Sequence, residues 1–293
     1  MHTPTRVPAP RATGYTATTD VPLFWAAYGE SGAPRVLVLH GGPGADHEYL
    51  LPQMLELADE RELLFYDQRG GGRSRTDDRG TVTWQTHVAD LAAVVRELGL
   101  EPLTLIGYSW GGLLALLYAA TAAVDAALPV PKRLAVIDPA PVSRQFRDQF
   151  EAEFARRQAA PAVQALRDEL LASGLRERDP EAFRQRAFEL SVAGYFADPR
   201  AARNLTPFRV VGRIQQSVWE SLGDYDLVAD GRLGTIRSPV LVVHGREDPI
   251  PLASSEACAR AVGGELVVLD GCGHVPYVEQ PAALFAALKR FLA

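Results

Sequence analysis

The chain has 293 residues, of which 47% are apolar, and a net charge of −6, as is typical of a soluble globular protein with a large core. The acidic balance argues against a nucleic-acid partner, and the most apolar run, Leu113 to Val124, is too short to span a bilayer. No apolar leader marks the N-terminus for secretion, so the expected location is the cytoplasm.

The cysteine count limits the possible covalent and metal chemistry. Cys258 and Cys272 are too few for a disulfide framework or a zinc cluster, so two semi-buried thiols are the simpler interpretation, with a pair between them left open. No metal-ligand spacing occurs elsewhere, and neither a metal nor a cofactor is expected. The expected partner is a small molecule or short peptide, and the sequence leaves the oligomeric state undetermined.

The first elements are three apolar or β-branched runs: Thr16 to Thr19, Leu23 to Tyr28 and Arg35 to His40. The third run is continuously apolar and ends at two glycines, which is typical of a strand buried on both faces. Strand-like and helix-like stretches then alternate. The further predicted strands are 62–66, 103–106, 133–137, 239–244 and 265–269, and the predicted helices are 83–98, 110–123 and 281–292. This alternation predicts an α/β fold with a mostly parallel sheet flanked by helices.

Residues 142–226 interrupt the alternation. They contain 13 arginines and 13 acidic residues but no lysine or histidine, and Phe146, Phe150 and Phe154 recur at helical spacing. Prolines and glycines divide the segment into four or five short predicted helices. We therefore expect a core formed by residues 1–141 and 227–293, with a helical insertion between the two parts.

A candidate nucleophile follows the predicted strand 103–106. Gly107-Tyr108-Ser109-Trp110-Gly111 matches the G-x-S-x-G pattern, in which a sharp turn between strand and helix projects a serine from the edge of the sheet. The pattern alone is common by chance, but its place between a strand and a helix favours Ser109 as a nucleophile.

A serine hydroxyl needs a base within hydrogen-bond reach. His2 and His87 are interpreted as solvated or capping residues, and His40 and His244 as packed residues at strand ends. His47 could line a pocket but precedes the serine, whereas His274 lies in a loop after the last predicted strand. His274 is therefore the predicted base, in the chain order serine, aspartate, histidine.

The predicted acid that orients this base is Asp248, which follows the strand 239–244 and falls between Ser109 and His274. A turn or helix-capping role is the simpler alternative for an aspartate before a proline. Asp138, also just beyond a strand, and Glu247 remain rival candidates.

An oxyanion needs preorganised backbone donors. His40-Gly41-Gly42-Pro43-Gly44 follows the first buried strand, and its glycines allow a close approach to the substrate. The N–H groups of Gly42 and Trp110 are the predicted oxyanion hole, and Gly41 is a candidate for substrate contact.

Four motifs in series carry a resemblance to a known family: His40 to Gly44, Asp67-Gln-Arg-Gly-Gly-Gly-Arg-Ser74, Gly107 to Gly112, and Gly245-Arg-Glu-Asp248. With them the chain resembles the proline iminopeptidase branch of the α/β-hydrolases over residues 14–141 and 227–293. The resemblance implies an α/β-hydrolase fold, a Ser109, Asp248 and His274 triad, and residues 142–226 as a helical cap. It implies a structural and pocket-wall role for the Asp67 motif.

The predicted function is that of a serine hydrolase acting through an acyl-enzyme, and an aminopeptidase that releases an N-terminal residue such as proline is favoured. Family aminopeptidases hold the free amine with acidic side chains, for which Glu189 and Glu220 are the candidates in the insertion, where Gln215 and Gln216 occupy a stretch suited to glutamate. A carboxylesterase or lactonase with the same triad is the alternative. A non-catalytic small-molecule receptor remains a further one.

Overall fold

The structure is a computed structural model that describes residues 7–78 and 82–293. Its centre is an eight-stranded sheet with the order β1-β2-β4-β3-β5-β6-β7-β8. The strands are β1 (Ala12–Tyr15), β2 (Phe24–Tyr28), β3 (Arg35–Leu39), β4 (Glu62–Tyr66), β5 (Thr104–Tyr108), β6 (Arg133–Ile137), β7 (Val240–Gly245) and β8 (Glu265–Leu269). Among these described strands, only the pairs β1–β2 and β2–β4 are antiparallel. The predicted mostly parallel sheet is confirmed.

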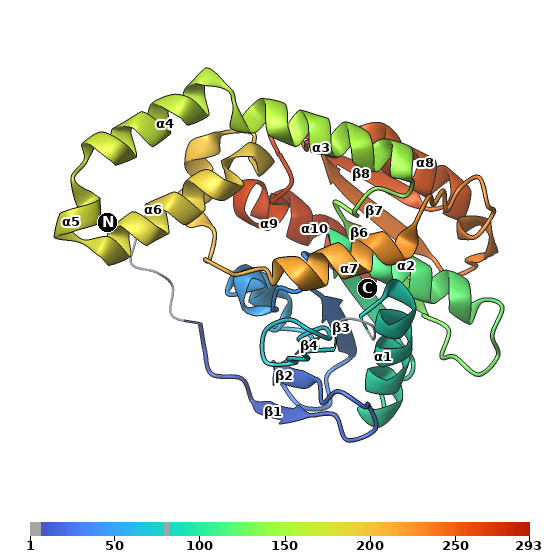
Figure 1. The fold of residues 1–293 in the computed structure, drawn as a ribbon. Coiled ribbons are helices and arrows are strands. Elements are labelled where there is room, and N and C mark those ends of the chain that lie inside the picture. Colours follow the sequence, from blue (N-terminus) through green and yellow to red (C-terminus); the bar gives the residue numbers. More distant parts are fainter. Residues whose placement is uncertain (1–6, 79–81) are drawn as a thin grey trace.

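Helices cover both faces of this sheet (Figure 1). One face packs against α1 (Trp84–Glu97), α2 (Trp110–Ala122) and α8 (Leu252–Val262), and the other against α10 (Pro281–Leu292). The short helix α9 (Pro276–Glu279) directly precedes α10. Almost every residue of α2 is buried, which accounts for its apolar sequence on all sides.

The first β-branched run differs from the expectation of a strand. No strand forms over Thr16 to Thr19: residues 17–20 form bends after β1, and the Thr16 hydroxyl accepts a hydrogen bond of 2.8 Å from the Leu23 N–H. The N–H of Thr18 donates to the carboxylate of Glu97. Side-chain bonds of this kind satisfy backbone groups outside a sheet, so a threonine-rich run does not need a partner strand.

In the part of the chain that the structure describes, five α-helices lie between β6 and β7, and we call them the inserted helices: α3 (Arg144–Gln158), α4 (Pro161–Ala172), α5 (Leu175–Arg178), α6 (Pro180–Val192) and α7 (Gly212–Leu222). Figure 1 shows α3 to α6 arched above the sheet and α7 returning across it.

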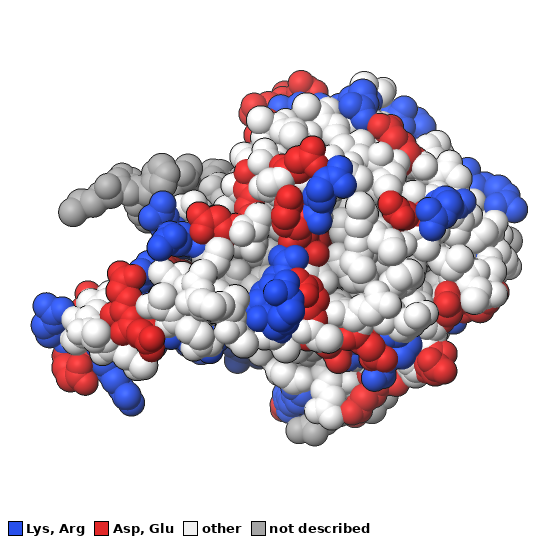
Figure 2. Space-filling model, turned by 90° about the horizontal axis from the view of Figure 1, so that it is seen from above, with Lys and Arg blue, Asp and Glu red and all other residues white. Residues whose placement is uncertain are grey.

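Acidic and basic residues lie interspersed on the face seen from above in Figure 2. Several of them form ion pairs within α3, such as Arg144 with Asp148 one turn later. Across residues 7–78 and 82–293, no helix has the length and apolarity needed to cross a membrane.

Candidate active site

Ser109 occupies the turn between β5 and α2 in a strained backbone conformation. Its φ of 53° and ψ of −119° are rarely adopted by residues with a side chain. A Cβ atom on Gly111 would collide with the carbonyl oxygen of Leu39, and one on Gly107 would collide with that of Gly111. The two glycines therefore permit the close packing that this turn requires.

His274 lies in the loop after β8 with its ring against Ser109. Its Nε2 is 3.0 Å from Ser109 Oγ, and its Nδ1 is 2.7 Å from Asp248 Oδ2. The backbone N–H of His274 donates to the carbonyl of Tyr195, and the Tyr195 ring stacks on the imidazole at 5.1 Å. The structure thus places the predicted nucleophile, base and acid in one hydrogen-bonded series, with Nε2 facing the serine.

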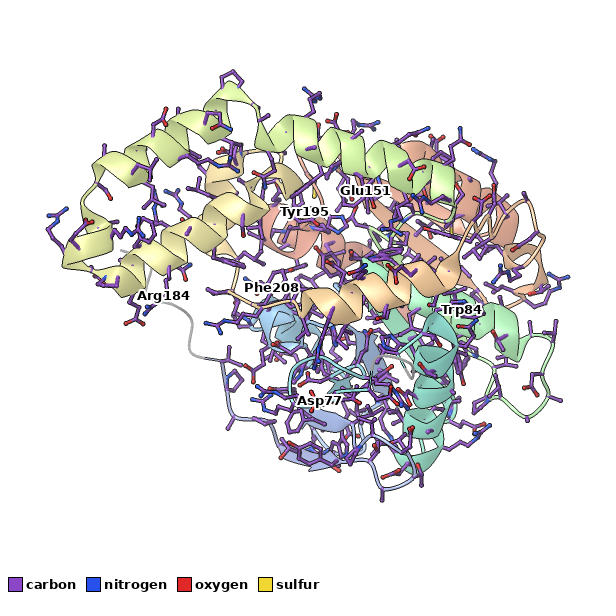
Figure 3. The ribbon with its side chains drawn as sticks, viewed as in Figure 1. Asp77, Trp84, Glu151, Arg184, Tyr195 and Phe208 are labelled. Atoms are coloured by element: carbon purple, nitrogen blue, oxygen red, sulfur yellow. The ribbon has the colours of Figure 1, made fainter. Side chains whose placement is uncertain are left out.

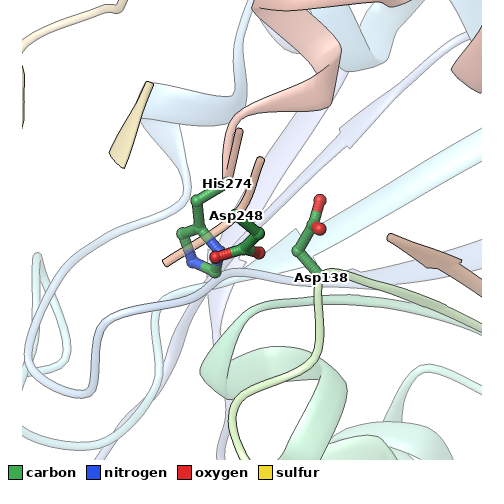
Figure 4. Close-up of side chains that lie close together, drawn as sticks. All are labelled: Asp138, Asp248 and His274. Atoms are coloured by element: carbon green, nitrogen blue, oxygen red, sulfur yellow. The ribbon is translucent and has the colours of Figure 1, made fainter. Parts of the chain in front are cut away.

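A second carboxyl group lies beside this series. Asp138, at the end of β6, has a φ of 41°, is fully buried, and accepts the Gly245 N–H at 2.7 Å. Figure 4 shows Asp138 next to Asp248 and His274, and the ligand atoms of the three side chains lie within 4.8 Å of one another. Asp248 instead accepts from His274 and from the Ile250 N–H at 2.7 Å. The two rival acids are therefore neighbours, and Asp248 is the one bonded to the base.

Burial dominates the titration of these groups. It lowers the pKa of His274 from the ordinary value of 6.5 to about 4, so the imidazole is neutral and able to accept a proton at neutral pH. Burial, followed by the charge of Asp248, raises the pKa of Asp138 well above its usual range. Burial also raises the pKa of Asp248, but the proton of the pair belongs on Asp138, since Asp248 receives two N–H groups.

Two backbone N–H groups beside Ser109 are available to bind an oxyanion. Among the described residues, the N–H groups of Gly42 and Trp110 have no hydrogen-bond acceptor. Gly41 packs against the nucleophile, because a Cβ atom there would lie 2.8 Å from the Ser109 Cβ, and its N–H donates to Tyr49 Oη. Gly42 lines the cavity described next, whereas Gly41 is not among the residues that line it.

The hydroxyl of Ser109 opens into a cavity of about 540 Å³ between the sheet edge and the inserted helices. Its walls are mainly apolar and rich in aromatic side chains. The aromatic lining residues are Tyr49, Tyr108, Trp110, Phe150, Phe154, Phe188, Tyr195, Phe208, Trp219 and Tyr277. Figure 3 marks Tyr195 and Phe208, which come from two segments of the insertion. A cavity of this size and lining suits a small, largely apolar acyl group.

The charged groups in the cavity come from α3. Glu151, marked in Figure 3, and Arg147 form an ion pair of 2.8 Å one helical turn apart, and the Arg147 guanidinium lies over the Trp219 ring at 4.3 Å. The polar side chains of Gln215 and Ser191 also line the wall. The sequence analysis missed Arg147 and Glu151, although both flank the phenylalanines that recur at helical spacing.

The two predicted acidic contacts lie elsewhere. Glu189 points to a separate pocket between α4 and α6, where it pairs with Arg186 at 2.9 Å. Glu220 is exposed and accepts a hydrogen bond from Gln216 at 2.6 Å. Each glutamate directly follows an aromatic residue of the cavity wall, and the rotation of about 100° per helical residue turns it away. Their expected contact with substrate is therefore not supported by their placement.

Most of the other histidines have structural partners, but His87, expected to be solvated or to cap a helix, is buried with its ring against that of Trp110. His40 bonds to Gln68, His47 to Asp67 at 2.7 Å, and His244 to Ser255, while His2 lies outside the described residues. Cys258 and Cys272 are both buried and free. Within residues 7–78 and 82–293, the one group that could hold a metal ion consists of Asp138, Asp248 and His274, the carboxyl groups and base described above.

A sequence model of the alpha/beta hydrolase family matches residues 36–288. A curated relative, a proline iminopeptidase of Levilactobacillus brevis, is 30% identical over 281 residues, which cover 88% of each chain. A proline iminopeptidase of Lactobacillus delbrueckii subsp. lactis is 28% identical over 280 residues, which cover 88% of this chain and 89% of the relative.

Solved structures of hydrolases named for different activities share the fold. The proline iminopeptidase of Mycobacterium smegmatis superposes with a TM-score of 0.68 at 23% identity and covers 96% of this chain and 97% of its own. The enol-lactonase of Burkholderia xenovorans superposes with a TM-score of 0.66 at 22% identity. The superposition covers 95% of this chain and 99% of the lactonase. At these identities the likeness establishes the fold alone.

Proposed function

The chain belongs to the alpha/beta hydrolase family and is related to proline iminopeptidases, and on this premise we propose that it cleaves a small amide or ester through an acyl-enzyme at Ser109. The observation that carries the proposal is the hydrogen-bonded series from Ser109 through His274 to Asp248. It adjoins two backbone N–H groups without acceptors among the described residues.

In the proposed mechanism, Ser109 Oγ attacks the substrate carbonyl while His274 Nε2 takes the hydroxyl proton. Asp248 holds Nδ1–H and stabilises the imidazolium. The N–H groups of Gly42 and Trp110 receive the developing oxyanion, and such donors contribute roughly 3–4 kcal/mol each. His274 then protonates the leaving group, and water activated by the same imidazole releases the acyl group.

The favoured substrate is an amide with a free N-terminal residue such as proline. Two observations support it: the relatives named proline iminopeptidase, which align with 88% of this chain, and the Glu151 carboxylate on the wall of a cavity rich in aromatic residues. A carboxylate and aromatic faces both attract an ammonium group. A pyrrolidine ring also suits the apolar walls near Ser109.

One observation favours a second candidate, a carboxylesterase or lactonase. Arg147 pairs with Glu151, so the α3 groups in the cavity have no net charge. A neutral cavity with aromatic walls binds an uncharged acyl group without having to compensate a buried charge. This candidate has the same triad and the same oxyanion contacts.

A comparison of three substrates separates the candidates. We expect prolyl p-nitroanilide to be cleaved with a far higher kcat/KM than its N-acetyl derivative, and Glu151→Gln to reduce that preference about tenfold through the loss of one charged contact. The Ser109→Ala variant is the blank, with kcat lowered by about four to six orders of magnitude.

Equal cleavage of the free and acetylated amides, together with fast hydrolysis of p-nitrophenyl butyrate, would support the esterase instead. Labelling of the wild-type protein by a fluorophosphonate, and not of Ser109→Ala, is the independent check on the nucleophile. A wild-type protein that neither labels nor hydrolyses these substrates would refute the hydrolase proposal in favour of a receptor.

A further inference from the structure

The segment Asp67 to Ser74 has no part in the proposed chemistry, yet the side chains of Asp67, Gln68, Arg69 and Ser74 are buried. It follows β4, and β3 lies between β4 and β5 in the sheet. Gln68 is only 1% exposed. Buried amide groups are costly unless both their donor and acceptor are used, so the contacts of Gln68 are informative.

The Gln68 side chain connects two segments across the end of β3. Its Oε1 accepts a hydrogen bond of 2.8 Å from Trp110 Nε1, and its Nε2 donates one of 2.7 Å to the carbonyl of His40. The backbone N–H of Gln68 also donates to His40 Nε2 at 3.1 Å. One residue thus binds the start of α2 and the residue that opens the glycine loop.

These two segments carry the two N–H groups beside Ser109 that have no acceptor among the described residues. Trp110 supplies one through its own backbone, and Gly42, two residues after His40, supplies the other. Their separation depends on how the glycine loop sits against the start of α2. We propose that Gln68 is the positioning residue of the oxyanion hole and sets this separation; the inference rests on the proposed function.

The chemistry of the site requires an amide at this position. Trp110 Nε1 offers only a donor and the His40 carbonyl only an acceptor, and a carboxamide matches both at once. A glutamate would keep the bond to the indole but place an oxygen against the carbonyl. A leucine would leave both buried groups unpaired, at about 1–3 kcal/mol for each.

The neighbours of Gln68 hold its backbone in place. Asp67 accepts from the ring and the backbone N–H of His47 and from the N–H of Arg73. The Arg69 guanidinium is bound to the buried Asp90 through two hydrogen bonds of 2.6 and 2.8 Å. Because the backbone of Gln68 is held in place, its carboxamide fixes the positions of both hydrogen-bond partners, the Trp110 indole and the His40 carbonyl.

The test compares wild type, Gln68→Leu and Gln68→Glu with p-nitrophenyl acetate as substrate and a trifluoromethyl ketone as an inhibitor that forms an oxyanion on Ser109. We expect kcat to fall by roughly 10- to 100-fold, as for a small misplacement of catalytic donors, with KM within about threefold. The inhibition constant of the ketone should rise by the same factor as kcat falls. The pH at which kcat/KM declines should not move.

Ser74→Ala is the matched control. The Ser74 hydroxyl makes two hydrogen bonds in the same buried motif, to the Asp67 carbonyl and from the Phe24 N–H, and neither involves His40 or Trp110. We expect this variant to lose thermal stability while its kcat stays within about threefold of wild type.

Gln68 variants with wild-type kcat, or a Ser74→Ala variant that loses as much kcat as they do, would overturn the inference while the hydrolase proposal stands. A wild-type protein that fails to hydrolyse the ester and fails to label with a fluorophosphonate would overturn both. If Gln68→Leu does not fold, the Gln68→Glu variant alone decides between these outcomes, because it retains the bond to Trp110.

Discussion

The carboxyl groups of Asp138 and Asp248 lie side by side behind His274, and their hydrogen-bond partners assign them different charges. Asp248 faces an imidazole and a backbone N–H, both of which favour a carboxylate. Asp138 has one such donor, and its Oδ2 has no partner among the described residues. A protonated Asp138 beside an ionised Asp248 is the arrangement with least repulsion.

This assignment predicts opposite results for two isosteric substitutions. Asp248→Asn should lower kcat by about four orders of magnitude, because an amide cannot hold the imidazole in the required tautomer. Asp138→Asn should leave kcat/KM within about threefold of wild type, because it replaces one neutral group by another. The measurement is the pH profile of kcat/KM for an ester substrate.

The acidic side of that pH profile tests the charge of Asp138 directly. Activity requires neutral His274, whose pKa is lowered to about 4, so kcat/KM should hold its plateau below pH 6.5 and decline toward pH 4 as the imidazole is protonated. Asp138→Asn should not move this decline. A decline that shifts to lower pH by one unit or more would show that Asp138 is ionised and raises the pKa of His274.

For individual residues, the sequence predicted the reacting groups better than it predicted the side chains around them. Ser109, Asp248 and His274 each follow a strand, so the parallel sheet brings them to one edge. The polar contacts within the cavity were not predictable in the same way. Helical spacing placed Phe150 and Phe154 on one face, but no pattern in one sequence says that Arg147 and Glu151, beside that face, also line the cavity.

A short 3₁₀ helix, η3 (Ala193–Tyr195), is the element through which the insertion contacts the base. Its last residue accepts the His274 N–H at 2.7 Å and stacks on the ring. Gly273 makes the contact close, since a Cβ atom there would collide with the Tyr195 carbonyl oxygen and lie 2.8 Å from the Ala197 nitrogen. The backbone of the insertion therefore helps to hold the loop of His274.

Gly273→Ala should push η3 and the loop of His274 apart. The added methyl group must displace η3 or the loop, so we expect kcat to fall by roughly 10- to 100-fold as His274 moves from Ser109. The free energy of unfolding should decrease by about 1–3 kcal/mol from overpacking. Steady-state kinetics and urea unfolding measure the two effects.

Gly234→Ala is the control for this variant. A Cβ atom on Gly234 would have no described heavy atom within 4 Å, and the φ of this residue is not positive, so alanine there should be tolerated. Wild-type kcat in Gly273→Ala would show that contact with η3 does not position the base. The contact was not predictable, because the sequence shows strand and helix periods but not where two loops meet.

Buried histidines couple the stability of the whole molecule to pH. Burial lowers the pKa of His87 to about 3 and that of His244 to about 4, against an ordinary value of 6.5. Between these values the unfolded chain binds protons that the folded chain does not. Each of these histidines therefore contributes stability that is complete above pH 6.5 and is lost as the pH falls toward the folded-state pKa.

His87→Leu should remove one of these contributions. Leucine does not titrate, so the variant should gain stability relative to wild type as the pH falls below 6.5, by up to about 1.4 kcal/mol per pH unit. Urea unfolding at pH 7.5, 5.5 and 4.5 measures the difference. A difference that stays constant over this range would show that His87 keeps its ordinary pKa in the folded protein.

The fold of the whole molecule was more predictable than its residue contacts, because continuous apolar strands that alternate with helices can be arranged in few ways. The threonine-rich run at 16–19 was the exception, since β-branched residues favour strands only where a neighbouring strand is available. The sequence also did not reveal the path by which residues 193–196 return to the sheet edge.

That return path has a consequence for protein engineering. The Ala193–Tyr195 turn belongs to the insertion in sequence but to the loop of His274 in its contacts, and Arg157 of α3 also donates to the Glu247 carbonyl beside Asp248. A chimera in which the whole insertion is replaced by that of another protein would lose the contact of Tyr195 with His274 and that of Arg157 with Glu247. Recombination boundaries that leave this turn with the parent sheet would change the substrate cavity and preserve the base.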